Sequence, residues 1–92
     1  MERRDQIDDI NFVKECFLKQ EGLNDAYNVM NNLFLYQINC WKILNKRSML
    51  KKTKQLHKFF KIDIRLYDFK RYVKLLENNA YNLEYLRLFE LG

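Results

Sequence analysis

The stretch Tyr27–Trp41, YNVMNNLFLYQINCW, decides the fold. Its apolar residues recur every three or four positions, which is the spacing of one face of an α-helix. They form two adjacent stripes, so the predicted helix is apolar over a wide part of its circumference and lies at the centre of the fold. Asn24 or Asp25 can cap it, and we expect it to end near Asn45. The first stripe is Tyr27, Met30, Phe34, Ile38 and Trp41, and the second is Ala26, Val29, Leu33, Tyr36, Cys40 and Ile43.

A short amphipathic helix is predicted before this stretch. It runs from Asp8 or Asp9 to Lys19, and the acidic residues at its start suit the positive end of the helix dipole. Gly22 is a natural stop, because glycine readily adopts the left-handed conformation that closes many helices. The apolar residues that define this helix are Ile7, Ile10, Val13 and Phe17.

A third helix is predicted after the central one, from Met49 to about Lys61. Ser48 precedes it and is a residue type that caps helices well. Apolar residues recur on one side of this helix, and we expect that side to be buried. These residues are Met49, Thr53, Leu56 and Phe60.

The last third of the chain has no clear helical period. Residues 62–66 (IDIRL) alternate apolar and charged side chains, which indicates a strand or extended segment. The stretch 83–89 (LEYLRLF) fits either a strand or a last helical turn or two. The polar run 78–82 (NNAYN) is typical of a turn, so a β-hairpin from about Tyr72 to Leu91 is one interpretation of this region. The predicted fold class is mainly α: two or three helices, then a short extended segment and a small C-terminal β-hairpin, in one domain comprising residues 1–92.

Size and composition exclude several classes of protein. Of the 92 residues, 48% are hydrophobic and 15% aromatic, which excludes a disordered chain. No apolar run approaches about 18 residues, so we expect no membrane span and no membrane partner. The start (MERRDQIDD) has no apolar stretch behind it, so we expect no secretory signal. The chain has two cysteines, where a secreted domain of this size usually has roughly four to eight, which favours an intracellular, reducing compartment.

Charge is segregated along the chain. The net charge is +5, but residues 42–74 contain twelve basic and two acidic residues, whereas residues 1–41 contain four basic and seven acidic ones. Such concentrated charge usually has a polyanionic partner, because it opposes folding by self-repulsion. Nucleic acid is the first interpretation; a helix face kept basic for solubility, and an acidic protein or membrane surface, are the others. Four lysines share one face of the third predicted helix: Lys51, Lys54, Lys58 and Lys61.

Basic and aromatic residues interleave in 58–61 (KFFK) and 65–72 (RLYDFKRY). Cations bind phosphates, and flat rings can stack on unpaired bases. For each ring taken singly, including Phe60, Tyr67 and Phe69, a core position is the favoured interpretation. We expect three further cations to join the four lysines in contacting RNA phosphates without sequence preference: Arg65, Lys70 and Arg71.

The sequence offers no set of residues for catalysis or metal binding. A closed zinc site needs four ligands, and the soft ligands here are Cys16, Cys40 and a predicted surface histidine, His57. Both cysteines belong to apolar stripes, where a thiol is inert. Asp63 and Asp68 lack supporting metal ligands and more simply neutralise neighbouring arginines. We therefore expect no enzyme activity, no metal and no cofactor.

The stretch Phe34–Gln37 (FLYQ) begins a pattern that resembles the zinc-ribbon protein subunit of eukaryal and archaeal ribonuclease P and its relative in RNase MRP. Members of that family open with two helices, the first often with a Phe-Leu-Tyr-Gln-type sequence. Their second helix is basic and leads into an extended Ile-Arg-Leu-like segment followed by Lys-Arg. The counterparts here are Lys51–Lys61, Ile64–Leu66 and Lys70–Arg71, and the resemblance covers about residues 27–73.

The chain departs from that family at the zinc ribbon. Val73 and Leu76 stand near the position of the family's first Cys-x-x-Cys pair, and there is no second pair. The resemblance therefore implies that the metal is lost and that an apolar cluster packed on a partner holds the hairpin. That cluster is Val73, Leu75, Leu76, Leu83, Tyr85, Leu86 and Phe89.

Together these features predict a non-catalytic RNA-binding subunit of a ribonucleoprotein. The resemblance implies a nuclear protein that holds structured RNA during removal of the 5′ leader from precursor tRNA. We expect the apolar face around Phe34, Tyr36 and Trp41 to dock at least one protein subunit of the complex. The alternative is a small helical adaptor or inhibitor, including a viral one, that binds a protein through the Tyr27–Trp41 helix. A DNA-binding helical module is the third interpretation. It is the weakest because no glycine turn of a helix-turn-helix motif is visible before the basic helix.

Overall fold

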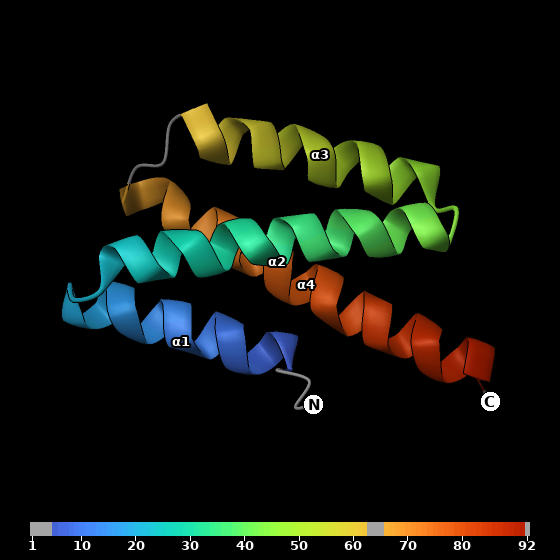
Figure 1. Ribbon diagram of the computed structural model, residues 1–92, viewed down its shortest axis with the longest axis horizontal. Coiled ribbons are helices and arrows are strands. Elements are labelled where there is room, and N and C mark those ends of the chain that lie inside the picture. Colours follow the sequence, from blue (N-terminus) through green and yellow to red (C-terminus); the bar gives the residue numbers. More distant parts are fainter. Residues whose placement is uncertain (1–4, 63–65, 92) are drawn as a thin grey trace.

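The computed structural model describes residues 5–62 and 66–91, and the side chains of residues 5–62 and 69–86. Within these ranges the chain forms four helices and no strand: α1 (Gln6–Lys19), α2 (Leu23–Ile43), α3 (Arg47–Ile62) and α4 (Leu66–Leu91). Helices α1, α2 and α3 lie side by side with α2 in the middle, and α4 crosses behind α2 (Figure 1). The prediction of a mainly α fold with a central helix over the Tyr27–Trp41 stretch is confirmed, whereas the predicted number of two or three helices is wrong, because the described residues form four.

Local sequence explains where the first three helices begin and end. The carboxylate of Asp5 caps α1 by accepting a hydrogen bond from the backbone N–H of Ile7 at 3.1 Å. Gly22, at the start of α2, has a φ of 64°, a conformation that costs glycine little. Asn45 takes a φ of 56° after α2, and asparagine tolerates this left-handed conformation well. Ser48 lies inside α3 and does not cap it, because α3 already begins at Arg47.

Aromatic rings join the helices in two groups. In the first, Phe17 of α1 stacks on Phe69 of α4 with 3.9 Å between ring centroids. In the second, Phe34 of α2 lies 5.4 Å from Phe60 of α3 and 6.3 Å from Tyr72 of α4, measured between centroids. Burial of large rings contributes strongly to folding stability, so these groups fix α4 against the other three helices.

A buried network of hydrogen bonds runs through the centre of the bundle. Gln37 of α2 is 0% exposed, and its side-chain nitrogen donates to the carbonyl oxygen of Leu76 at 2.9 Å and to the side chain of Gln6 at 3.0 Å. The side-chain nitrogen of Asn79 in α4 donates to the amide oxygen of Gln37 and to the hydroxyl of Thr53 in α3, each at 3.1 Å. All four helices contribute a group, so the network specifies how they pack.

Helix α4 replaces the predicted β-hairpin, and the prediction of a hairpin from Tyr72 to Leu91 is wrong. Asparagine favours turns, but packing of the apolar side of α4 on α1 and α2 overrides that preference. Asn78 and Asn82 are exposed, and Asn79 belongs to the buried network. Three side chains of the apolar cluster expected to pack on a partner, Val73, Leu76 and Leu83, are instead buried in the core, whereas Tyr85 is exposed.

The extended segment predicted at residues 62–66 lies partly outside the described residues. Ile62 is the last residue of α3 and Leu66 is the first residue of α4, so both are helical. Residues 63–65, which include Ile64, lie outside the described residues. The two described ends of the predicted extended segment are therefore helical, and the prediction is wrong for Ile62 and Leu66.

Candidate nucleic-acid interface

One side of α3 is buried, and a different side, about 100° around the helix axis from it, is basic. Thr53, His57 and Phe60 face the core. On the other side, cations follow one another at spacings of four and three residues, so they form one row along the helix. At 1.5 Å of rise per residue, this row is about 21 Å long. All five side chains are exposed, and we call them the basic row: Arg47, Lys51, Lys54, Lys58 and Lys61.

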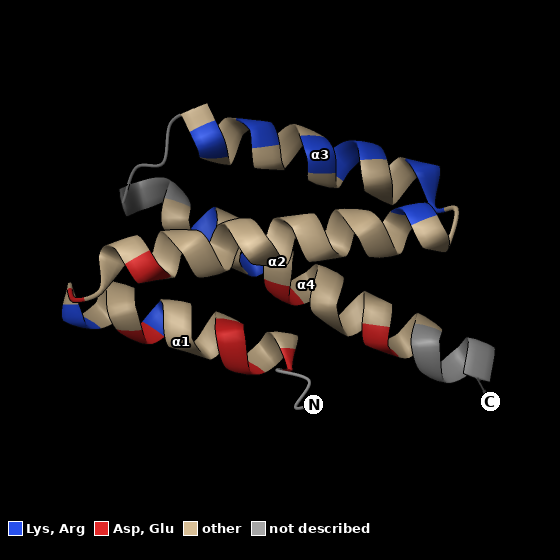
Figure 2. Ribbon diagram, in the orientation of Figure 1, with Lys and Arg blue, Asp and Glu red and all other residues tan. Residues whose placement is uncertain are grey.

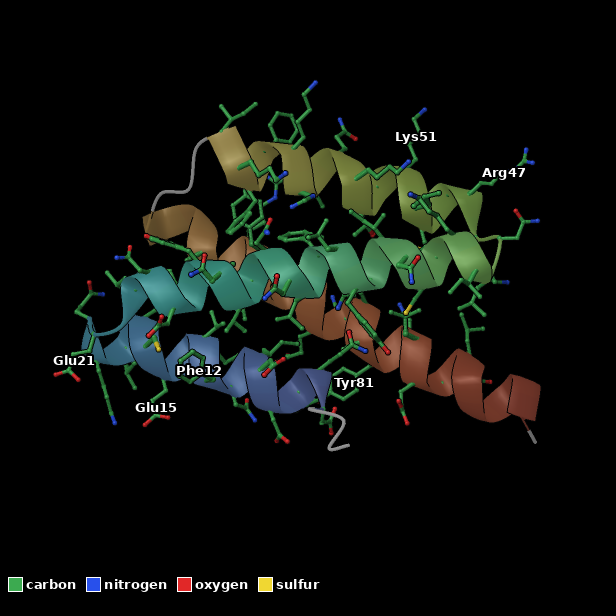
Figure 3. All side chains as sticks on the ribbon, in the orientation of Figure 1. Phe12, Glu15, Glu21, Arg47, Lys51 and Tyr81 are labelled. Carbon is green, nitrogen blue, oxygen red and sulfur yellow. The ribbon has the colours of Figure 1, made fainter. Side chains whose placement is uncertain are left out.

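Contacts on the buried side of α3 orient the basic row. Atom Nε2 of His57 lies 2.8 Å from Oδ1 of Asn31 in α2, and the His57 ring stacks on Phe34 with 5.1 Å between centroids. The hydroxyl of Thr53 accepts a hydrogen bond from Asn79 of α4. These contacts fix the rotation of α3 about its axis. The row therefore faces solvent, and Arg47 and Lys51 point away from α2 (Figure 3).

His57 was predicted at the surface, and this prediction is wrong, since it is only 7% exposed. Burial lowers the pKa of the imidazole, and the positive charge of Lys61 lowers it further. His57 is therefore neutral at neutral pH. It contributes packing and a hydrogen bond to the interface and adds no charge to the basic row.

The charge of the basic row is not neutralised by any ion pair among the described side chains. Helix α3 contains six basic residues and no acidic one. The ion pairs formed by described side chains lie elsewhere: Lys14 with Glu77 at 2.6 Å, and Lys19 with Glu15 at 2.7 Å. Cations follow the α3 edge of the molecule, whereas acidic residues gather along α1 at the opposite edge (Figure 2). The folded chain is thus strongly polarised across its width.

The cations predicted on the C-terminal side do not simply extend this row. Lys70 and Arg71 are both exposed on α4, but neighbouring residues of a helix point about 100° apart. Lys70 lines a cleft with Lys14 of α1, and Arg71 does not line that cleft. Arg65 lies outside the described residues. The seven predicted cations therefore do not form one surface.

Most rings of the interleaved segments are core residues. Phe60 and Tyr72 are buried, and Phe69 is held by its stacking on Phe17. The side chain of Tyr67 lies outside the described residues. Phe59, which is 52% exposed on α3, is the ring of the 58–61 stretch that remains accessible. The surface is therefore better suited to binding phosphates than to stacking on a series of bases.

Two of the three predicted partner-binding residues are buried inside the chain and cannot contact a partner. Phe34 is 0% exposed and Trp41 is 1% exposed, and the Phe34 ring packs against Phe60 of α3 and Tyr72 of α4. The prediction that these two side chains contact a partner is corrected accordingly. Tyr36 is 53% exposed and stays on the outer face of α2, together with Leu35 and Ile43.

The described residues contain no group of three or more His, Cys, Asp or Glu side chains that could hold a metal ion. Cys16 and Cys40 are free thiols. Burial raises the pKa of the Cys40 thiol, which disfavours its reactive thiolate.

Comparison with known proteins finds no match to a family model, to a curated protein or to a solved structure. None of the helices in the described ranges is long and apolar enough to cross a membrane.

Sequence reasoning missed Arg47, Gln37 and Asn79. Arg47 was overlooked because the helix was expected to begin at Met49. The two amides carry a signal that can be read from the sequence: each is a polar residue within an apolar stripe of helical spacing. Gln37 stands between Phe34 and Trp41, and Asn79 stands between Leu76 and Leu83.

Proposed function

We propose that this chain is a non-catalytic RNA-binding subunit of a ribonucleoprotein, with the basic row of α3 as its phosphate-binding surface. The observation that carries this proposal is the row itself: five exposed cations on one rigid face, without acidic partners among the described residues. A surface evolved only for solubility would intersperse both signs of charge. A row of one sign instead attracts a polyanion and orients it.

Binding through the basic row is expected to depend little on base sequence. Lysine side chains reach phosphate oxygens, and such contacts position a protein on nucleic acid without reading bases. With few accessible rings beside the row, selectivity for a particular RNA comes from its folded shape. A folded RNA places phosphates of several segments close together, which suits a rigid protein surface better than a flexible single strand does.

Ribonuclease P is the particle we propose for this subunit. The resemblance at Phe34–Gln37 followed by a basic helix supports this choice, and α2 and α3 are two consecutive helices in the expected order. The C-terminal part differs from the family, because α4 takes the place of a zinc ribbon. The proposal therefore depends on the region from about residue 27 to residue 73.

Purification of the tagged chain from its native cell, followed by sequencing of the bound RNA, tests this proposal. We expect one structured RNA to be enriched together with precursor tRNA. Lys54→Glu combined with Lys58→Glu should abolish that enrichment while the protein remains folded. Recovery of proteins alone, with no enriched RNA, would contradict the proposal.

A protein-binding adaptor is the second candidate, favoured by the exposed apolar side chains of Leu35, Tyr36 and Ile43 on the outer face of α2. Tyr36→Ala distinguishes the two candidates better than a substitution of the buried Trp41 would. If the chain is an adaptor, Tyr36→Ala weakens partner capture and the α3 charge reversal does not.

A further inference from the structure

A cleft between α1 and α4 brings together three lysines that are distant in sequence. Its volume is about 280 Å³, and it is lined by Lys14, Phe69, Lys70, Val73, Lys74 and Glu77. Lys70 and Lys74 are one helical turn apart on α4, about 6 Å along the axis. Lys14 comes from α1, so the cleft depends on the packing of the two helices.

The floor of the cleft is rigid and apolar. Phe69 stacks on Phe17 of α1, and Val73 is buried in the core. The charged groups are at the rim, where Lys14 is paired with Glu77 at 2.6 Å and both side chains are partly exposed. Lys70 and Lys74 have no ion-pair partner among the described side chains. An apolar floor with free cations at its rim suits a phosphodiester backbone, whose sugars are weakly polar and whose phosphates are charged.

The cleft and the basic row are formed by different helices. The row belongs to α3, whereas the cleft is lined by α1 and α4, and α2 lies between α1 and α3 (Figure 1). A ligand that fills both surfaces must therefore contact α1 and α4 as well as α3.

We propose that the α1–α4 cleft is a second site for RNA phosphates, through which one copy of the chain holds two segments of a folded RNA together. This inference rests on the proposed RNA-binding function. It assigns a role to Lys74 and Lys14, and it separates Lys70 from the α3 surface. Glu77 opposes binding in this scheme, because its carboxylate repels phosphate and competes for Lys14.

Two short RNA duplexes, one with a donor dye and one with an acceptor dye, test the proposal when mixed with a limiting amount of protein. Energy transfer between the duplexes reports bridging, and the anisotropy of one duplex alone reports the affinity for a single duplex. Sedimentation confirms that the bridging species contains one copy of the chain. We expect bridging by the wild type. Lys70→Gln with Lys74→Gln should reduce bridging at least about fivefold and change single-duplex affinity less than about twofold.

Glu77→Gln is expected to change bridging in the opposite direction from the lysine substitutions. It removes the repelling carboxylate, so bridging should increase about threefold or more. A merely structural ion pair would show no such gain. Lys19→Gln, a charge loss on α1 outside the cleft, serves as the matched control and should bridge as the wild type does. Unchanged bridging in Lys70→Gln with Lys74→Gln, or no gain in Glu77→Gln, would overturn the second site, whereas wild-type protein that binds no duplex would overturn the RNA-binding function itself.

Discussion

At the scale of single residues, the buried amides carry much of the specificity of this fold. Gln37, Asn79 and Thr53 are each almost completely buried, and the side-chain nitrogen of Asn79 donates hydrogen bonds to the other two. Removal of Asn79 leaves the amide oxygen of Gln37 buried without the donor that it had, and an unsatisfied buried acceptor costs more free energy than the hydrogen bond contributes net. A network of this kind disfavours other packings of the same helices, because a shifted helix would leave buried amides unpaired.

Asn79→Ala is expected to lower the free energy of unfolding by about 2 kcal/mol, because Gln37 and Thr53 lose the donor they share. Urea denaturation followed by circular dichroism measures the change. Asn78→Ala, an exposed neighbour on the same helix, is the control and should change stability by less than about 0.5 kcal/mol. Equal effects of the two substitutions would contradict the network.

His57 predicts a dependence of stability on pH. Its pKa in the folded chain is lowered from 6.5, so the unfolded chain binds more protons in the window below that value. The stability that His57 provides is present above about pH 6.5 and is lost as the pH falls through the folded pKa. Thermal melts between about pH 7.5 and 5 measure this loss. His57→Gln should melt with a weaker dependence on pH than the wild type, and an identical dependence would refute this role.

At the scale of helices, the sequence predicts α1, α2 and α3 but not α4, and the reason is physical. The apolar stripes of Tyr27–Trp41 are dense enough to define a helix without knowledge of its neighbours. In α4 the stripe is interrupted by asparagines, and the helix is stabilised by contacts with α1 and α2 that lie far away in sequence. Such contacts cannot be read from local preference, and local preference favoured a turn at residues 78–82.

Proline at position 82 tests whether α4 is one continuous helix. Asn82 is exposed, so its replacement removes little packing, but proline inside a helix costs about 3 kcal/mol. We expect Asn82→Pro to lower both helical circular dichroism and the melting temperature, whereas Asn82→Ala preserves both. A turn of a hairpin would accept the proline, so an unchanged melting temperature would contradict the helix.

For the candidate site too, some features could be predicted from the sequence and others could not. The four lysines of the basic row could be predicted because their spacing lies within one helix. The roles of Lys70 and Arg71 could not be separated, since that requires the contact between α1 and α4. The burial of Phe34 and Trp41 could not be predicted either, because the sequence does not show which side of an apolar helix is covered by other helices of the same chain.

At the scale of the whole molecule, the described charges divide the fold into a basic edge along α3 and an acidic edge along α1 (Figure 2). Such a distribution orients the protein in the field of a polyanion before contact is made. It predicts that the α3 edge meets the RNA first. The acidic α1 edge then faces away, except at the cleft formed with α4.

The most direct test of the basic row is the salt dependence of RNA affinity. Each phosphate neutralised contributes about 0.7 to 0.9 to the slope of log affinity against log salt concentration, so the five contacts of the basic row contribute about −3.5 to −4.5 to the slope. Anisotropy with one structured RNA, between about 50 and 200 mM salt, measures it. Lys54→Gln with Lys58→Gln should reduce the slope by about 1.4 to 1.8, whereas Lys54→Arg with Lys58→Arg should retain it. An affinity independent of salt, or a slope that the glutamine variant leaves unchanged, would contradict the account.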